Sequence, residues 1–404
     1  MAINKITPLD TFVSNDAPIC YGIFKPGDHY EGGIPVIKVK NIIGGVILED
    51  DLLKTTPEIH AQYKRAEVKE GDILLTIRGT TGRVAIVPNS LNGANITQDT
   101  ARIRVSSNDD SLYIFYALQS FNVQQQITLN TVGQAVKGIN IAEVKKLKIY
   151  HPILDEQKAI AQILSTWDQA ISATEKLLEN SQQQKKALMQ QLLTGKKRLL
   201  DEARSRFNIS WEKHRLGIFL KEEKQRNKDN SISRVLSVTN HSGFILPENQ
   251  FSKRIASDEV SNYKVVRQGQ YGYNPSRINV GSFARLDQFE NGLLSPMYVV
   301  FSIKSENLDS DFFLYWMKSN EAKQRINNST QGSVRDSVGF DAISSFVLKL
   351  PEIQEQRKIA KVLSFADQEI ETLQKKLNCL KQEKKALMQQ LLTGKRRVKL
   401  GELK

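Results

Sequence analysis

One stretch of this chain occurs twice, and it decides how the fold is organised. Residues 156–198 read EQKAIAQILSTWDQAISATEKLLENSQQQKKALMQQLLTGKKR, and residues 355–397 read EQRKIAKVLSFADQEIETLQKKLNCLKQEKKALMQQLLTGKRR. The two stretches lie 199 residues apart, align without a gap and agree at 25 of 43 positions. A repeat of this length in a chain of 404 residues predicts two tandem copies of one unit.

The same offset recurs more faintly in the regions that precede each stretch. Asn41 falls on Asn240, and the pair Asn92-Gly93 falls on Asn291-Gly292. Each copy is therefore a diverged region followed by a closely matched helix. We expect the diverged regions to do related but different jobs, and the matched helices to do one job twice.

Mostly apolar residues in the repeated stretches recur at alternating spacings of four and three, with Thr174, Ser181 and Lys185 as the polar members of the first series. The first series starts at Ile160, Leu164, Trp167 and Ile171 and runs to Leu192, and its counterpart runs from 359 to 391. This spacing, kept over about five heptads, is typical of a coiled-coil seam. The simplest partner for each seam is the other one, in either orientation. The alternative is two amphipathic helices that each pack only on their own domain.

Proline and glycine mark the expected ends of both helices. Pro152 and Pro351 stand just before the repeated stretches, and Gly195 and Gly394 near their ends are candidate C-terminal caps. Asp155 is a candidate N-cap of the first helix.

Composition and charge narrow the class of protein. The chain carries 57 Lys and Arg against 44 Asp and Glu, a formal net charge of +13, which favours an acidic partner such as nucleic acid. Its two cysteines, Cys20 and Cys379, are too few for a disulfide framework or a cysteine zinc site. No stretch is apolar enough for a membrane span or a signal peptide, so we expect a cytoplasmic, multidomain protein with no membrane partner.

Most of the excess positive charge lies at the ends of the two helices, in residues 183–206 and 381–404. A solvated helix end accounts for some of these side chains, because cations are favoured near a helix C-terminus. The doubled tract GKKR/GKRR also fits contact with a polyanion or an acidic protein surface, and the sequence leaves both interpretations open.

The regions 1–150 and 199–350 are predicted to be mixed α/β (α+β). Short strands are expected at PVIKVKNI, GDILLTI, RVAIV and ARIRV in the first copy, and at RVLSV, MYVVFSI and FVLKL in the second. A helix is expected near SLYIFYALQSF and again near DFFLYWMKSNEAKQRI.

Several loops between these strands are rich in side chains that hydrogen-bond bases and phosphates. Arg pairs with guanine, Asn and Gln with adenine, and Ser and Thr with phosphates. A single loop of this kind is more often a plain surface turn, but such loops recur at equivalent places in both copies. The candidate DNA-binding residues are Arg78, Thr80, Thr81, Arg83, Gln98, Gln134, Lys137, Asn274, Ser276, Arg277, Asn279, Ser333 and Arg335.

Catalytic and cofactor motifs are not found in the sequence. It has no phosphate-binding G-x-x-x-x-G-K-[ST] loop, no G-x-G-x-x-G after a strand, and no metal spacing among its five histidines. The string Asn274-Pro275-Ser276-Arg277 lacks the second proline and the aromatic residue of a methyltransferase amine-binding turn. We therefore expect a recognition protein with no catalytic residue, no cofactor and no metal.

The pattern as a whole resembles the specificity subunit of type I restriction-modification systems. Two diverged domains alternate with two matched helices that open with P-x-x-x-E-Q-x-x-I-A-x-x-L-S-x-x-D-x-x-I, at Pro152–Ile171 and Pro351–Ile370. The resemblance covers essentially the whole chain.

This resemblance implies a different function for each segment of the chain. Target recognition domains at 1–150 and 199–350 would each read one half of a split, asymmetric double-stranded DNA sequence. Conserved helices at 151–198 and 351–397 would pair as an antiparallel coiled coil that spaces the domains, with residues 398–404 as a tail. Two methyltransferase subunits, which carry S-adenosylmethionine and methylate adenine N6, would dock on this scaffold, and two motor-nuclease subunits would complete the restriction enzyme.

Two other functions remain open from the sequence. One is a methyltransferase-nuclease with its catalytic part in the same chain, against which the missing motifs weigh. The other is a free-standing nucleic-acid-binding adaptor that dimerises through its helices.

Overall fold

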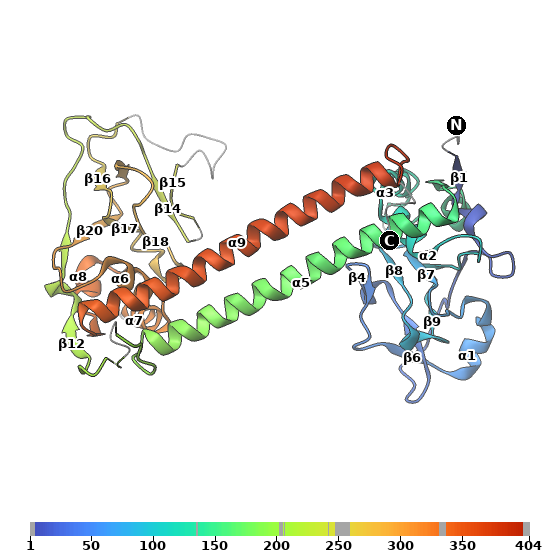
Figure 1. The fold of residues 1–404 in the computed structure, drawn as a ribbon, viewed down its shortest axis with the longest axis horizontal. Helices are drawn as coiled ribbons and strands as arrows, with labels where there is room; N and C mark the ends of the chain where they lie inside the picture. Colours follow the sequence, from blue (N-terminus) through green and yellow to red (C-terminus); the bar gives the residue numbers. More distant parts are fainter. Residues whose placement is uncertain are drawn as a thin grey trace. The chain divides into compact units, whose positions relative to one another are not determined.

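The fold consists of two compact units that share the two long helices. The computed structural model describes residues 5–134, 136–201, 205, 207–240, 242–246, 259–330 and 337–398. Unit 1 comprises residues 1–175 and 375–404, and unit 2 comprises residues 176–374 (Figure 1). The architecture is α+β, with two pseudo-repeated globular regions each followed by a long helix.

Unit 1 is built around a four-stranded antiparallel sheet with the order β2-β10-β7-β8. Smaller sheets pair β1 with β11 and β4 with β5, and join β6, β3 and β9. Its strands are β1 (Ile6–Pro8), β2 (Cys20–Tyr21), β3 (Ile34–Ile37), β4 (Ile42–Ile43), β5 (Val46–Ile47), β6 (Leu53–Thr55), β7 (Ile73–Thr76), β8 (Val84–Ile86), β9 (Asn95–Ile96), β10 (Thr100–Ile103) and β11 (Lys148–Tyr150). Its helices before the long one are α1 (Pro57–Gln62), α2 (Ser111–Gln119), α3 (Phe121–Leu129) and α4 (Ile141–Lys145).

Unit 2 repeats this plan with a four-stranded sheet of order β13-β20-β17-β18. Two-stranded sheets pair β12 with β21, β14 with β15 and β16 with β19. Its strands are β12 (Glu212–Arg215), β13 (Leu220–Glu222), β14 (Ser237–Thr239), β15 (Gly243–Ile245), β16 (Lys264–Arg267), β17 (Tyr271–Tyr273), β18 (Phe283–Arg285), β19 (Asn291–Leu294), β20 (Val299–Ile303) and β21 (Val347–Leu350). Its short helices are α6 (Ser310–Met317), α7 (Asn320–Thr330) and α8 (Phe340–Ser345).

The two long helices are α5 (Leu154–Leu192) and α9 (Ile353–Leu391). Each ends before a glycine in the left-handed region, Gly195 with φ 71° and Gly394 with φ 70°, so the predicted C-terminal caps are confirmed. The predicted N-cap is wrong. The helix α5 already begins at Leu154, so Asp155 lies in its first turn, where a negative charge favours the positive end of the helix dipole.

The two long helices pair antiparallel within each unit. In unit 1 the first half of α5 lies beside the last half of α9, where Glu156 binds Arg397 and Asp168 binds Lys384 (Figure 1). Residue numbers rise along one helix as they fall along the other, which defines an antiparallel pair.

Unit 2 repeats these contacts at the equivalent positions, which lie 199 residues away. There Glu355 binds Arg198, and Asp367 binds Lys185. The apolar seam positions of α5 and α9 are buried or half-buried throughout, as the coiled-coil spacing predicts. The beginning of α5 also packs on its own domain, because Ile160 and Leu164 belong to the core of unit 1 together with Leu391 of α9.

The buried glutamate of the E-Q motif anchors each helix pair. Glu355 is fully buried, and Arg198 binds it through two parallel bonds, Nε to Oε1 at 2.6 Å and Nη2 to Oε2 at 2.7 Å. The indole Nε1 of Trp211 donates to the same carboxylate at 3.1 Å. Glu156 and Arg397 form the equivalent bidentate pair in unit 1. The last arginine of each basic tract is therefore paired with a buried carboxylate of its own unit, although the side chain of Arg397 stays partly exposed.

A tyrosine links each globular region to its helix pair. Tyr116 Oη donates to Asp168 Oδ2 at 2.8 Å in unit 1, and Tyr315 Oη donates to Asp367 Oδ2 at 2.8 Å in unit 2. Burial, aided by these hydrogen bonds to a carboxylate, raises the pKa of both tyrosines, so both remain proton donors.

The helix expected near residues 111–121 is confirmed as α2, with a further helix, α3, after it, whereas the helix expected near residues 311–326 is broken into α6 and α7. In unit 1 the two helices meet at Ser120, whose hydroxyl accepts from the Val123 backbone N–H. In unit 2 the break falls at Lys318 and Ser319, and the Ser319 hydroxyl accepts from the Ala322 backbone N–H. A serine favours the extended cap conformation over a continued helix, because its side chain replaces a backbone acceptor.

Candidate nucleic-acid interface

The predicted recognition loops occupy the same place in the two sheets. Residues 78–83 connect β7 to β8, and residues 277–282 connect β17 to β18. Because β7–β8 and β17–β18 are equivalent hairpins, Arg78 and Arg277 stand at equivalent positions, 199 residues apart. Each hairpin loop borders an open cavity on its own unit.

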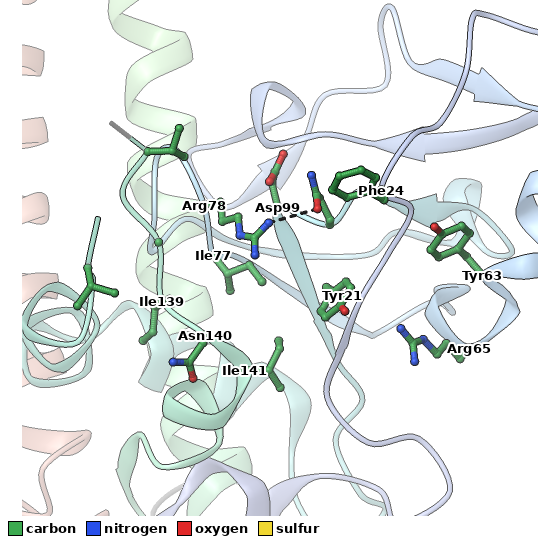
Figure 2. A pocket seen from close by; sticks show the side chains of 14 residues that line it. Tyr21, Phe24, Tyr63, Arg65, Ile77, Arg78, Asp99, Ile139, Asn140 and Ile141 are labelled. Atoms are coloured by element: carbon green, nitrogen blue, oxygen red, sulfur yellow. Dashed lines mark hydrogen bonds between the residues drawn. The ribbon is translucent and has the colours of Figure 1, made fainter. Parts of the chain in front are cut away.

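The cavity of unit 1 is large and partly aromatic. It measures about 1160 Å³, and Arg78, Gln98 and Asn140 supply polar groups to its wall. Tyr21 and Phe24 line it with exposed fractions of 44% and 58%, and the Arg65 guanidinium lies over the Tyr21 ring, 5.6 Å from its centroid. In Figure 2, Tyr21, Phe24, Tyr63 and Arg65 lie to the right, and Ile139 and Asn140 lie to the left.

Arg78 and Gln98 form a side-chain pair in this cavity. Arg78 Nη1 donates to Gln98 Oε1 at 3.2 Å (dashed in Figure 2). The bond orients the guanidinium and leaves its other N–H groups available, since a guanidinium has five donors. A planar donor fork at the edge of an open cavity suits a bidentate acceptor such as a guanine edge or a phosphate.

The other predicted residues of this loop have different surroundings. The Nη1 of Arg83 donates to the backbone carbonyls of Val39 and Ile42, at 3.2 and 3.1 Å. Arg83 therefore holds the 39–42 segment against the hairpin. Thr80 is exposed and Thr81 is half-buried, and the Thr80 carbonyl accepts from the Thr76 hydroxyl.

Gln134 and Lys137 lie on a neighbouring loop and are both exposed. Val132 and Gly138 close this loop with two backbone hydrogen bonds, and the Lys137 carbonyl accepts from the Gly79 backbone N–H at 3.0 Å. The structure thus brings the predicted residues at 78–81, 98 and 134–137 to one side of unit 1.

Unit 2 has a smaller cavity, about 210 Å³, lined by Asn274 and Arg277 together with polar residues of the 237–240 segment. Asn274 Oδ1 accepts from the Ser276 backbone N–H at 3.0 Å, which shapes the turn. Ser276, Arg277 and Asn279 are exposed. The predicted residues Ser333 and Arg335 lie outside the described residues.

Sequence reasoning missed the aromatic rings of the first cavity and Asn140. Tyr21, Phe24 and Tyr63 come from segments far from the Arg78 loop, and only their exposure distinguishes them from core residues. That exposure follows from tertiary packing, so spacing along the chain carries no signal for it.

The described ranges offer neither a metal-binding cluster nor a membrane-spanning helix. No group of three or more His, Cys, Asp or Glu side chains there could hold a metal ion. Within the same ranges, no helix is both long enough and apolar enough to cross a lipid bilayer. Each unit thus has an equivalent hairpin loop that carries an arginine at an open cavity. This arrangement is that of a protein with two binding domains in tandem.

A comparison with known protein families shows which family the chain belongs to. Residues 24–181 and 258–382 match the family model of the type I restriction modification DNA specificity domain. The chain belongs to this family.

Curated relatives carry the same description. The chain is 30% identical over 188 residues to the type I restriction enzyme EcoBI specificity subunit of Escherichia coli, a match that covers 46% of this chain and only 40% of that relative. It is 26% identical over 356 residues to the MjaVIII specificity subunit of Methanocaldococcus jannaschii, covering 83% of this chain and 81% of the relative.

Solved structures show the same fold at low identity. The S subunit of the type I restriction-modification system from M. genitalium superposes with a TM-score of 0.55 at 15% identity, with 96% of each chain covered. The HsdS subunit from Thermoanaerobacter tengcongensis gives a TM-score of 0.53 at 16% identity, with 98% of each chain covered.

Proposed function

We propose that this chain reads a bipartite, asymmetric sequence in double-stranded DNA, with one half read by each recognition domain. The observation that carries the proposal is the pair of equivalent hairpins, which place Arg78 and Arg277 at two cavities of different lining. Equivalent position supports a shared mode of docking, and different lining supports different base preferences. The domains would be residues 1–150 and 199–350.

The helices would space these domains and dock the catalytic partners. Their repeated sequence fits two copies of one methyltransferase subunit, one on each repeat, with two motor-nuclease subunits completing the restriction enzyme. The methyltransferase subunits would bind S-adenosylmethionine and methylate adenine N6. The specificity chain itself would have no catalytic residue, cofactor or metal.

The test compares the chain alone with the chain plus its matching methyltransferase subunit. We expect the purified chain alone to bind no S-adenosylmethionine and to methylate no DNA. With the partner added, adenine methylation should appear at one motif of two short blocks separated by a non-specific spacer, read by methylome sequencing.

Other outcomes support the alternative functions. Methyl transfer by the chain alone would indicate a self-contained methyltransferase. Sequence-specific binding without any stable methyltransferase complex would indicate a free-standing adaptor.

A further inference from the structure

A second cavity of unit 2 is walled by lysines and is lined by none of the predicted recognition residues. It measures about 560 Å³ and lies between the last turns of α5 and the junction of α6 with α7. Glu321 is the single acidic residue on its wall. Its lysines are Lys185, Lys186, Lys196, Lys318 and Lys323.

Most of this positive charge has no internal counter-ion. Lys185 binds Asp367, and Glu321 is already paired with Arg325. Within the described ranges, no carboxylate lies within 4.0 Å of the ammonium groups of the other four lysines. Loss of solvent around its ammonium group, together with repulsion from Lys185, lowers the pKa of Lys318. An anion in the cavity would favour the charged ammonium group and so oppose both effects.

Two of the lysines on the cavity wall, Lys318 and Lys323, have no lysine counterpart in unit 1. The positions equivalent to Lys318 and Lys323 in unit 1, 199 residues earlier, hold Gln119 and Gln124. Gln124 Nε2 donates to the Gly82 carbonyl at 2.9 Å, so this position serves the hairpin in unit 1. A protein that docked once on each repeat would meet the same residues twice. Because Lys318 and Lys323 occur in unit 2 alone, a partner that meets the same residues on each repeat does not account for them.

The position of α7 connects the cavity to the candidate DNA interface. This helix carries Lys323 and packs against residues Ile278–Val280, which belong to the hairpin loop of Arg277 and Asn279. The lysine cavity and the second recognition loop thus both border α7.

We propose that Lys318 and Lys323 bind backbone phosphates of the DNA that lies against the second recognition loop. The inference rests on the proposed function, since it needs DNA at that loop. Lysine is a compact charge on a flexible stem, suited to phosphate contacts that position the duplex and read no base.

The test uses the double variant K318Q/K323Q in the complex with methyltransferase subunits. Glutamine is the residue that unit 1 holds at both positions, so the fold should tolerate it, and circular dichroism checks this. Binding is measured by fluorescence anisotropy over a salt series, with target and non-target duplexes. We expect both duplexes to lose affinity by the same factor, with an unchanged methylation motif. The slope of log K against log salt should become less steep by about 1.8, from roughly 0.9 for each phosphate contact.

The matched control is K213Q/K349Q. These lysines are exposed and face each other across β12 and β21, so the control removes the same charge elsewhere on unit 2. In the control, the slope of log K against log salt should change much less than it does in K318Q/K323Q.

Three results would overturn the inference: an unchanged slope in K318Q/K323Q, an equal change in the control, or loss of methyltransferase subunits with the slope unaltered. The last would assign the cavity to an acidic protein surface. If the wild-type complex shows no preference for a target, the proposed function itself fails. Specific wild-type binding with an unaltered variant slope refutes only the phosphate contacts.

Discussion

Arg78 and Arg277 occupy one position of a repeated hairpin but have different neighbours. Arg78 is oriented by Gln98 in a cavity bordered by the exposed rings of Tyr21 and Phe24. Arg277 shares a smaller cavity with Asn274. Equivalent backbone positions with different partners let one fold present two different hydrogen-bonding surfaces.

The variants R78A and R277A test this assignment at single residues. R78A should weaken or relax recognition of one half of the DNA target by about 1–3 kcal/mol, the range for a lost bidentate guanine contact. R277A should do the same to the other half. Competition binding with duplexes mutated in each half measures both. An effect of R78A on the half that R277A affects would contradict the assignment.

R83A is expected to behave differently from R78A. Its guanidinium holds two backbone carbonyls of the 39–42 segment, so its loss should lower stability. The sequence alone ranked these two arginines equally, because both flank the same loop. The structure distinguishes them, because Arg78 bonds Gln98 at the cavity and Arg83 bonds backbone carbonyls.

The buried carboxylate of Glu355 provides a prediction on stability. E355A leaves the guanidinium of Arg198 and the indole N–H of Trp211 without their acceptor, and should cost about 3–5 kcal/mol in the free energy of unfolding. Chemical denaturation measures the loss.

The controls for E355A separate the buried ion pair from charge removal in general. E212A removes an exposed carboxylate and should change stability by less than about 1 kcal/mol. The double variant R198M/E355M should be more stable than E355A, because it leaves no unpaired buried charge. A double variant as unstable as the single one would contradict this account.

Among the elements, the long helices were the part best predicted from sequence. Seam spacing, flanking prolines and terminal glycines are local signals, and the structure confirms the helices with their C-terminal caps. The break at Ser319 was missed, because one helix was expected over residues 311–326, and the helix α3 after Ser120 was not predicted. The function of the E-Q motif was also missed, since the partner of Glu156 is Arg397, which no local pattern connects to it.

The candidate site was only partly predictable. The composition of polar loops is a local signal, so the sequence singles out the Arg78 and Arg277 loops, and both lie at open cavities. The aromatic wall around Tyr21 and the lysines at the α6–α7 junction depend on which segments meet in space, and a single sequence does not record that.

A paired insertion tests whether the helices set the spacing of the DNA target. Four residues are inserted between Glu175 and Lys176, and four between Gln374 and Lys375, all of them exposed positions. Each helix then gains about 6 Å with only about 40° of rotation. The non-specific spacer should lengthen by one or two base pairs, at about 3.4 Å each, with both half-sites unchanged.

Methylome sequencing of each insertion variant gives the result. Two-residue insertions serve as the control, because they rotate the following segment by about 200° and should abolish methylation. An unaltered spacer with methylation intact in the four-residue variant would show that the helices do not set the distance. Insertion after Gln191 is less suitable, because Leu192 and Leu193 lie in the core of unit 2.

At the scale of the whole molecule, each recognition domain should be replaceable by the corresponding domain of a relative. Replacing residues 1–150 with the same region of a relative should change one half of the DNA target and leave the other intact. The new domain would still meet Ile160, Leu391 and Leu392, which line the core of unit 1 and lie in the repeated stretches. Motif sequencing of the chimera is the measurement. A change in both halves would show that the domains do not read independently.

The division of the helices between the units also has a consequence for synthesis. Unit 2 is one continuous segment, whereas unit 1 needs residues 375–404 to complete its core. At about 5–20 residues per second, a ribosome needs roughly 10–40 s to make the intervening segment. The domain translated first is thus completed last, and until then the groove that will receive Leu391 and Leu392 is open. We expect a chain released after residue 374 to contain all of the second unit, to expose an apolar surface on the first and to bind chaperones.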